Sequence, residues 1–305
     1  SEGLEVLRSL NNGKEYTILH RSIVDNSTSI EKYGYVSQQK VETVLSSYDL
    51  PGIASFSSYQ FSKDESKILL ATDVEPIFRR STLGIFYVYD IASKKLTRIS
   101  DSKIQEPTMS PDGSIVAYVS ENNLYLFDIS SGATKQLTTD GERNKIINGV
   151  TDWVYEEEFA FVRAFEWNSN GTKIAFLRFD ESAVPEFSMD IYGTDLYPKP
   201  HVFKYPKAGE NNAIVSLHTY DLKSNAISKI DLGDAYYIPR IKWMNKINFL
   251  SVQTINRHQN DLRLHAVNTK DGSVSLLMQE TDEAYVDITD NLTFLEDDRF
   301  IWSSE

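Results

Sequence analysis

Short runs in which apolar and polar residues alternate fill most of the chain, and polar turns separate them. One unit recurs, in which an apolar anchor is followed by a turn rich in Asn, Asp, Ser and Gly and then by a β-rich run. Alternation with a period of two predicts half-buried strands rather than helices. The clearest anchors of this unit are Phe61, Met109, Trp167, Trp243 and Phe294, with a weaker copy at Leu10.

The unit at residues 107–140 shows the strands most clearly. We expect four short antiparallel strands in it, at residues 108–109, 115–119, 124–129 and 134–138. Four strands per unit, and a spacing near the roughly 40–50 residues of a propeller blade, predict an all-β fold, a β-propeller with five to six blades visible and the last one incomplete. A β-sandwich also has short, evenly spaced strands, but the recurrence of a blade-sized unit favours the propeller.

The longest connections in this pattern would all emerge on one face of the propeller. In an antiparallel blade, the link between the second and third strands lies on the same face as the link to the next blade. The long links of both kinds are residues 73–82, 141–165, 180–212 and 254–260. Because function concentrates where loops are elaborated, we expect this face to carry the site.

The link at residues 141–165 contains the string D-W-V-Y-E-E-E-F at residues 152–159. Its aromatic residues predict a short helix, within residues 153–165, that packs on the propeller while its acids project. Adjacent carboxylates repel one another unless they are solvated or receive a cation. A pair of these acids could therefore bind an ammonium group through charge-assisted hydrogen bonds. A solvated acidic helix face is the alternative.

Arg79 and Arg80 occupy the link at residues 73–82, on the same predicted face. A guanidinium beside an acidic pair could balance its charge or donate to a carbonyl oxygen. Ordinary surface arginines are the alternative. His201 and His258 also fall in links of this face and could line a site, although loop histidines are usually just solvated.

Composition and motifs argue against several other functions. The net charge of −13, with no basic cluster, makes nucleic acid a poor partner. The longest apolar run, residues 85–89, is too short to span a bilayer. The chain has no cysteine, no Gly-x-Ser-x-Gly nucleophile motif and neither a His-Glu-x-x-His nor a calcium-loop pattern. We therefore expect no catalytic residues, metal site or cofactor here.

The string T-D-W-V-Y-E-E-E-F at residues 151–159 resembles the signature of the propeller domain of the dipeptidyl peptidase IV family, within the prolyl oligopeptidase group of serine peptidases. Further segments resemble that family in the same order. They are W-N-S-N-G-T-K-I-A-F at residues 167–176, V-P at 184–185 and Y-P-K-A-G at 205–209. The resemblance is good from about residue 61 to residue 212 and architectural elsewhere.

This resemblance implies an eight-bladed propeller that caps an α/β-hydrolase domain, in an enzyme that releases N-terminal dipeptides after Pro or Ala. In the family, the second and third acids of E-E-E hold the free amino group of the substrate, which assigns that role to Glu157 and Glu158. The arginine that contacts the substrate's backbone carbonyl matches the F-R-R-S context at Arg79 better than at Arg80. The resemblance also implies peptide substrates with a free N-terminus, a homodimer formed partly by residues 180–212, and a periplasmic or cell-surface location.

We expect residues 1–305 to be a partial propeller domain of a longer enzyme. The chain ends directly after the strand-like residues 299–302, and the hydrolase domain with its Ser, Asp and His is missing. On this interpretation the chain alone does not hydrolyse peptides. The alternative is a non-catalytic propeller for protein interaction, including an inactive relative of the enzyme. The presence of both acids together with Arg79 favours the enzyme.

Overall fold

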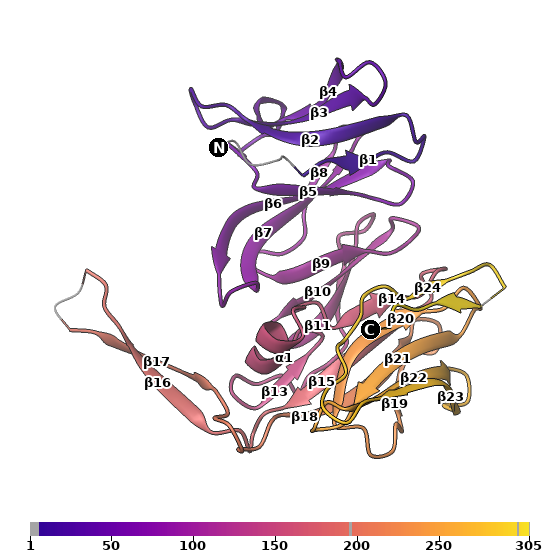
Figure 1. The fold of residues 1–305 in the computed structure, drawn as a ribbon. Helices are drawn as coiled ribbons and strands as arrows, with labels where there is room; N and C mark the ends of the chain where they lie inside the picture. The colour runs from indigo at the N-terminus through magenta and orange to yellow at the C-terminus, as the bar shows by residue number, and fades with distance from the viewer. Residues whose placement is uncertain (1–5, 195–196, 298, 305) are drawn as a thin grey trace. The chain divides into compact units, whose positions relative to one another are not determined.

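The computed structural model describes residues 6–194, 197–297 and 299–304, which form antiparallel sheets (Figure 1). The chain divides into two compact units. The first comprises Ser1–Ile77, Thr82–Ala117 and Leu126–Lys135, and the second comprises Phe78–Ser81, Tyr118–Tyr125 and Gln136–Glu305. The loop that carries Arg79 therefore belongs to the second unit, together with the acidic string.

Two four-stranded sheets belong to the first unit. One contains β1 (Arg8–Ser9), β2 (Glu15–Arg21), β3 (Thr28–Gly34) and β4 (Lys40–Ser46), and it is followed by a 3-10 helix, η1 (Ser47–Asp49). The other contains β5 (Ser58–Phe61), β6 (Lys67–Pro76), β7 (Thr82–Asp90) and β8 (Leu96–Arg98). Ile30, Phe56, Ile68 and Leu70 are buried in their common core.

A third sheet contributes residues to both units. It contains β9 (Gln105–Met109), β10 (Ile115–Ser120), β11 (Asn123–Asp128) and β12 (Thr134–Gln136). These strands confirm, within a few residues, the four that the sequence predicts for this unit. The turn after β9 shows why the sequence pattern predicts a turn here. The Asp112 carboxylate accepts from Ser110 Oγ at 2.6 Å and from Ser114 N at 3.1 Å, and Gly113 has a φ of 68°.

The second unit contains two further sheets. One has β14 (Phe165–Trp167), β15 (Lys173–Asp180), β18 (Ile214–Asp221) and β19 (Ala226–Ile230), and β13 (Ile146–Asn148) also pairs with β15. The other has β20 (Tyr237–Trp243), β21 (Phe249–Ile255), β22 (Asp261–Asn268) and β23 (Val274–Thr281). A short pair, β24 (Thr293–Phe294) and β25 (Phe300–Ile301), follows. The described residues thus form five blade-like sheets and the beginning of a sixth, which confirms the predicted fold class.

The long links contain elements of their own. The hairpin of β16 (Glu186–Ile191) and β17 (Lys199–Lys204) lies between β15 and β18 and extends away from the sheets of its unit (Figure 1). The helix α1 (Trp153–Glu158) lies between β13 and β14. The link predicted at residues 254–260 is shorter than expected, because β21 continues to Ile255 and β22 begins at Asp261. No helix among the described residues is both long and apolar enough to cross a membrane.

The helix is short and lies within the range that the sequence predicts. It ends at Glu158 because Phe159 caps it with a φ of −105° and a ψ of 0°, and Ala160 has a φ of 59°. A positive φ at a non-glycine residue is incompatible with continued right-handed helix. Val150 and Arg163 then form a β-bridge, which returns the chain to extended structure.

Candidate functional site: an acidic helix and an arginine loop

Helix α1 is fixed to the second unit by its cap and by one tyrosine. Asp152 is the N-cap residue, and its carboxylate accepts from Tyr155 N at 3.0 Å. The Tyr155 side chain is 1% exposed, and its hydroxyl accepts a hydrogen bond from Ile238 N at 3.0 Å. The Phe159 and Phe179 rings pack edge-on against Tyr155, with centroids 5.0 and 4.8 Å away. Because the N-cap and the buried Tyr155 ring fix this six-residue helix, its acids have defined directions.

The three acids of α1 lie in three different environments. Glu156 is 1% exposed, and its Oε1 accepts hydrogen bonds from the backbone N–H groups of Arg80 and Ser81 at 2.5 and 2.8 Å. Glu157 is partly buried, with its side chain 18% exposed, and Glu158 is exposed. The expectation that the acids all project is therefore wrong for Glu156, which points inward to satisfy two backbone donors.

The loop between β6 and β7 brings Arg79 to Glu157. Arg79 Nε lies 2.9 Å from Glu157 Oε2 and 3.1 Å from Oε1, and the arginine side chain is 71% exposed. Within the loop, Phe78 N donates to Ser81 Oγ at 3.2 Å. Of the two arginines that the sequence offers, Arg79 contacts the acidic pair through its side chain, whereas Arg80 contacts Glu156 through its backbone.

The long links that the sequence assigned to one face meet in the second unit. The Phe78 ring lies 5.8 Å from Phe203 of β17, and Trp153 of α1 lies 4.5 Å from Tyr205, directly after β17. In the fourth link, Arg257 Nη2 donates to the backbone oxygen of Glu210, in the link that contains β17, at 2.8 Å. Residues far apart in the chain thus meet in the second unit, as the blade geometry predicts.

The arrangement offers two carboxylates and one guanidinium for recognition of a ligand. Exposed ion pairs such as Arg79–Glu157 contribute little to stability, on the order of 0–1 kcal/mol, because water competes for both partners. A ligand ammonium can therefore join this pair at low cost and donate charge-assisted hydrogen bonds to the carboxylates of Glu157 and Glu158. The guanidinium still has N–H groups that can donate hydrogen bonds to a carbonyl oxygen.

Two further acids are buried beneath this surface, and sequence reasoning missed them as site features. Burial raises the pKa of Asp152 to about 6. Burial also raises the pKa of Glu181 to about 7, and the charge of Asp152 raises it further, while that of Lys204 lowers it. The signal available in the sequence was the position of Asp152 one residue before a helix with aromatic residues.

The histidines that the sequence offered lie on other elements than α1 and the arginine loop. His201 lies on β17 with its ring 5.5 Å from that of Phe203, and His258 lies in the turn between β21 and β22. His218 Nε2 is 2.9 Å from Ser216 Oγ, and burial lowers the pKa of this histidine to about 4. Among the described residues, no group of three or more His, Asp or Glu side chains could hold a metal ion.

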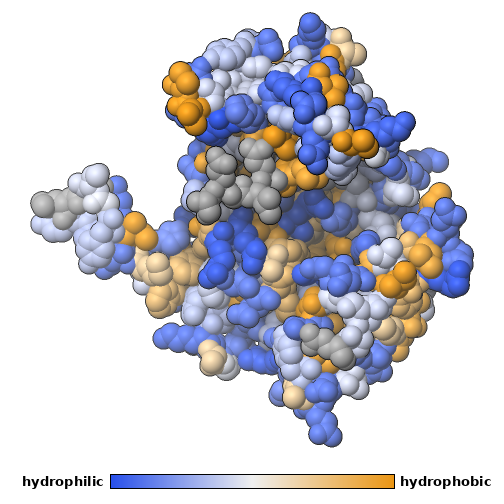
Figure 2. All heavy atoms as spheres, turned by 45° about the horizontal axis from the view of Figure 1, so that its top comes forward, coloured by the Kyte–Doolittle hydropathy of each residue, from blue (hydrophilic) through white to orange (hydrophobic). Residues whose placement is uncertain are grey.

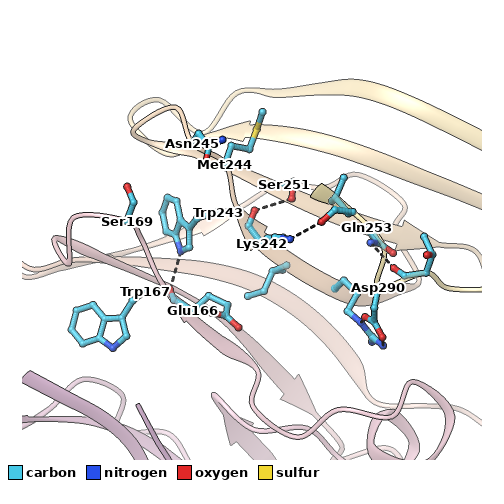
Figure 3. Close-up of a pocket in the computed structure, with 14 residues that line it drawn as sticks. Glu166, Trp167, Ser169, Lys242, Trp243, Met244, Asn245, Ser251, Gln253 and Asp290 are labelled. Carbon is cyan, nitrogen blue, oxygen red and sulfur yellow. Dashed lines mark hydrogen bonds and ion pairs between the residues drawn. The ribbon is translucent and has the colours of Figure 1, made fainter. Parts of the chain in front are cut away.

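A separate cavity of about 430 Å³ lies along β14, β20 and β21 in the second unit (Figure 3). Several of its polar groups already have partners: Lys242 Nζ donates to Leu292 O at 2.6 Å, and Trp243 Nε1 donates to Glu166 O at 2.9 Å. Arg240 Nε pairs with Asp290 Oδ1 at 2.5 Å. None of the predicted site residues lines this cavity, and we assign no function to it.

Comparison with known proteins identifies the family. The sequence model described as the dipeptidyl peptidase IV (DPP IV) N-terminal region matches residues 62–305. The chain belongs to this family. The members it resembles include a probable dipeptidyl-aminopeptidase B of Aspergillus clavatus, 34% identical over 230 residues, which are 68% of this chain and 25% of the relative. The corresponding protein of Chaetomium globosum is 33% identical over 228 residues, again 68% of this chain and 24% of the relative.

Solved structures of the dipeptidyl peptidase IV family agree with this assignment. The crystal structure of Porphyromonas gingivalis dipeptidyl peptidase 4 matches with a TM-score of 0.91 and 36% identity, over 97% of this chain and 43% of that one. A putative dipeptidyl aminopeptidase IV from Bacteroides ovatus has a TM-score of 0.70 and 22% identity, over 99% of this chain and 42% of that one, which shows the same fold. This chain spans about a quarter of the length of these curated relatives and less than half of the solved chains.

Proposed function

We propose that this chain is the substrate-selecting propeller segment of a serine exopeptidase that releases N-terminal X-Pro or X-Ala dipeptides. In this proposal Glu157 and Glu158 bind the N-terminal ammonium group of the peptide, and Arg79 donates to a backbone carbonyl oxygen of the substrate. The observation that carries the proposal is the contact of Arg79 with Glu157, 2.9 Å between Nε and Oε2, beside the exposed Glu158. Membership of the family supports the choice of a peptide as the ligand.

Two carboxylates at a fixed position determine which peptide bond of the substrate reaches the nucleophile. A free α-amine is a cation, and an internal peptide bond presents no cation at the corresponding place. If the amine must sit at Glu157 and Glu158, the bond presented to a nucleophile at a fixed distance is always the same one along the chain. A site of this kind therefore favours removal of dipeptides over internal cleavage.

The chemistry of bond cleavage belongs to a part of the enzyme outside these residues. In the proposal, residues 1–305 are a partial propeller domain, and a separate α/β-hydrolase domain supplies the Ser, Asp and His. The chain alone then does not hydrolyse peptides and needs no cofactor. We place such an enzyme in the periplasm or at the cell surface, and we propose that it is a homodimer in which the β16–β17 hairpin takes part.

Removal of either acid from the enzyme that contains this chain should reduce turnover of a Gly-Pro chromogenic substrate. We expect Glu157→Ala and Glu158→Ala each to lower kcat/KM by at least about tenfold, equivalent to roughly 1.4 kcal/mol, because the ammonium must still be desolvated with half of its partners gone. Steady-state kinetics of the purified variants measures this effect.

Glu42 provides a matched control, because it is also an acid in a surface ion pair, with Lys32 of β3 in the first unit. Glu42→Ala should leave kcat/KM unchanged. Wild-type turnover by both Glu157→Ala and Glu158→Ala would rule out the proposed roles of these acids.

A further inference from the structure

The first acid of the triplet is built into the protein rather than presented to solvent. Glu156 is 1% exposed, and one of its carboxylate oxygens, Oε1, accepts from Arg80 N at 2.5 Å and from Ser81 N at 2.8 Å. Burial of a carboxylate is costly unless donors replace the lost water. Two N–H groups on one oxygen supply that replacement, so α1 and the arginine loop are joined through a buried, charge-assisted contact.

This contact acts on the backbone of the loop and not on its side chains. Arg80 and Ser81 directly follow Arg79 in the chain, so fixing their N–H groups fixes the point from which the Arg79 side chain extends. The loop has two more constraints: Phe78 N donates to Ser81 Oγ at 3.2 Å, and the Phe78 ring packs near Phe203 at 5.8 Å. Consecutive acids on α1 thus contact consecutive residues of the loop, Glu157 with Arg79 and Glu156 with Arg80.

The exposed ion pair alone does not account for the position of Arg79. The arginine side chain is 71% exposed, and an ion pair in water is too weak to order a long side chain and its loop. Functional groups are held in place by supporting contacts that are themselves buried and hydrogen-bonded. Glu156 is the buried residue that makes such a contact with this loop.

We propose that Glu156 is a positioning residue, which holds Arg79 at the distance from Glu157 and Glu158 that a bound dipeptide unit requires. This inference rests on the proposed function. It gives Glu156 a supporting role and leaves Glu157 and Glu158 as the two residues that bind the substrate. At 1% exposure Glu156 does not contact the substrate; it acts through Arg79.

A double-mutant cycle in the enzyme that contains this chain tests the proposal. We expect Glu156→Ala to reduce kcat/KM for a Gly-Pro substrate by at least tenfold, mainly through KM. We expect Arg79→Ala to have a similar effect. The double variant should be little worse than either single variant, because both remove the same interaction with the substrate. Glu156→Gln should recover most of the activity, since its amide oxygen can accept from the same two N–H groups.

Glu31 is the matched control for a merely structural effect. It is a buried acid, 6% exposed, on β3 of the first unit, where it accepts from Ser29 Oγ at 2.5 Å and pairs with Lys40. Glu31→Ala should lower the melting temperature without changing KM. If Glu156→Ala does not fold, Glu156→Asp, which withdraws the carboxylate by one methylene, replaces it in the same cycle.

Two results would overturn the proposal. One is an unchanged KM in a folded Glu156 variant, and the other is a loss in the double variant equal to the product of the single losses, which would mean that Glu156 acts independently of Arg79. The proposed function is tested separately, because Glu157→Ala must still impair turnover. If the Glu156 variants have wild-type KM while Glu157→Ala is impaired, only the positioning role is refuted. If the Glu156 variants and Glu157→Ala all have wild-type kinetics, the proposed function is refuted as well.

Discussion

Three consecutive glutamates on α1 have three different surroundings because successive residues on a helix are rotated by about 100°. When one of these glutamates faces solvent, another is therefore turned toward the protein. From the sequence we expect a pair of these acids to bind an ammonium group, and the family resemblance assigns that role to Glu157 and Glu158. The sequence could not predict that Glu156 is the inward residue, because its donors are the backbone N–H groups of Arg80 and Ser81, which every residue except proline has.

The buried cap Asp152 predicts a pH-dependent stability. Its folded pKa of about 6 exceeds the ordinary value of 3.8, so the folded state holds its proton more tightly than the unfolded state. The stabilising contribution is complete below pH 3.8 and is lost as pH rises through about 6. Asp152→Asn keeps an oxygen that can cap Tyr155 N but carries no charge. We expect this variant to be more stable than the wild type at pH 8, by at most about 3 kcal/mol, and not at pH 4.

Thermal unfolding of both proteins at the two pH values measures the difference. Asp25, an exposed acid, is the control. Hydrogen bonds to Tyr48 and Ser22 lower its pKa, whereas burial raises the pKa of Asp152. A greater loss of stability in Asp152→Asn at pH 8 than at pH 4 would mean that the charged form of Asp152 is the one that the fold favours.

At the scale of elements, alternation and turn chemistry predicted the strands well, and two sheets share the same turn after their first strand. Asp64 and Asp112 both accept from the serine two positions before them and the serine two positions after them. The exact end of α1 could not be predicted, since it depends on the positive φ of Ala160, for which the sequence holds no signal. The β16–β17 hairpin was predicted only as a long link, because its apolar residues do not face a core.

The β16–β17 hairpin carries a prediction about association. Met189, Ile191, Tyr192 and Tyr197 on and beside its strands are 43%, 49%, 81% and 77% exposed, and Figure 2 shows hydrophobic surface on this hairpin among hydrophilic residues. Exposed apolar groups that gather on one element are typical of interaction surfaces. In the proposed homodimer, Ile191→Ser combined with Tyr192→Ser should raise the dissociation constant at least tenfold.

Sedimentation of the enzyme over a range of concentrations measures that constant. Val36→Ser is the control, because Val36 is 99% exposed in a turn of the first unit. An unchanged dissociation constant in the hairpin variant would exclude the hairpin from the interface.

At the scale of the whole molecule, the recurring unit predicted blades, and the family of dipeptidyl peptidase IV N-terminal regions has the same architecture in solved relatives. Blade geometry also predicted that links distant in sequence would share a face, and in the second unit the loop with Phe78, the helix α1 and the strand β17 do meet. Side-chain distances were beyond such reasoning, because a repeat pattern fixes the position of a loop but not the rotamers of its residues. The 2.9 Å contact of Arg79 with Glu157 therefore had to come from the structure.

The central claim is that Glu157 and Glu158 recognise a free N-terminal amine, and one comparison tests it most directly. The enzyme that contains this chain is assayed on a Gly-Pro chromogenic substrate with a free amino group and on the same substrate with that group acetylated. Acetylation removes the cation while leaving the scissile bond in place, so we predict at least a hundredfold lower kcat/KM for the acetylated form, equivalent to about 2.7 kcal/mol. Equal cleavage of both substrates, or cleavage of neither, would contradict the account.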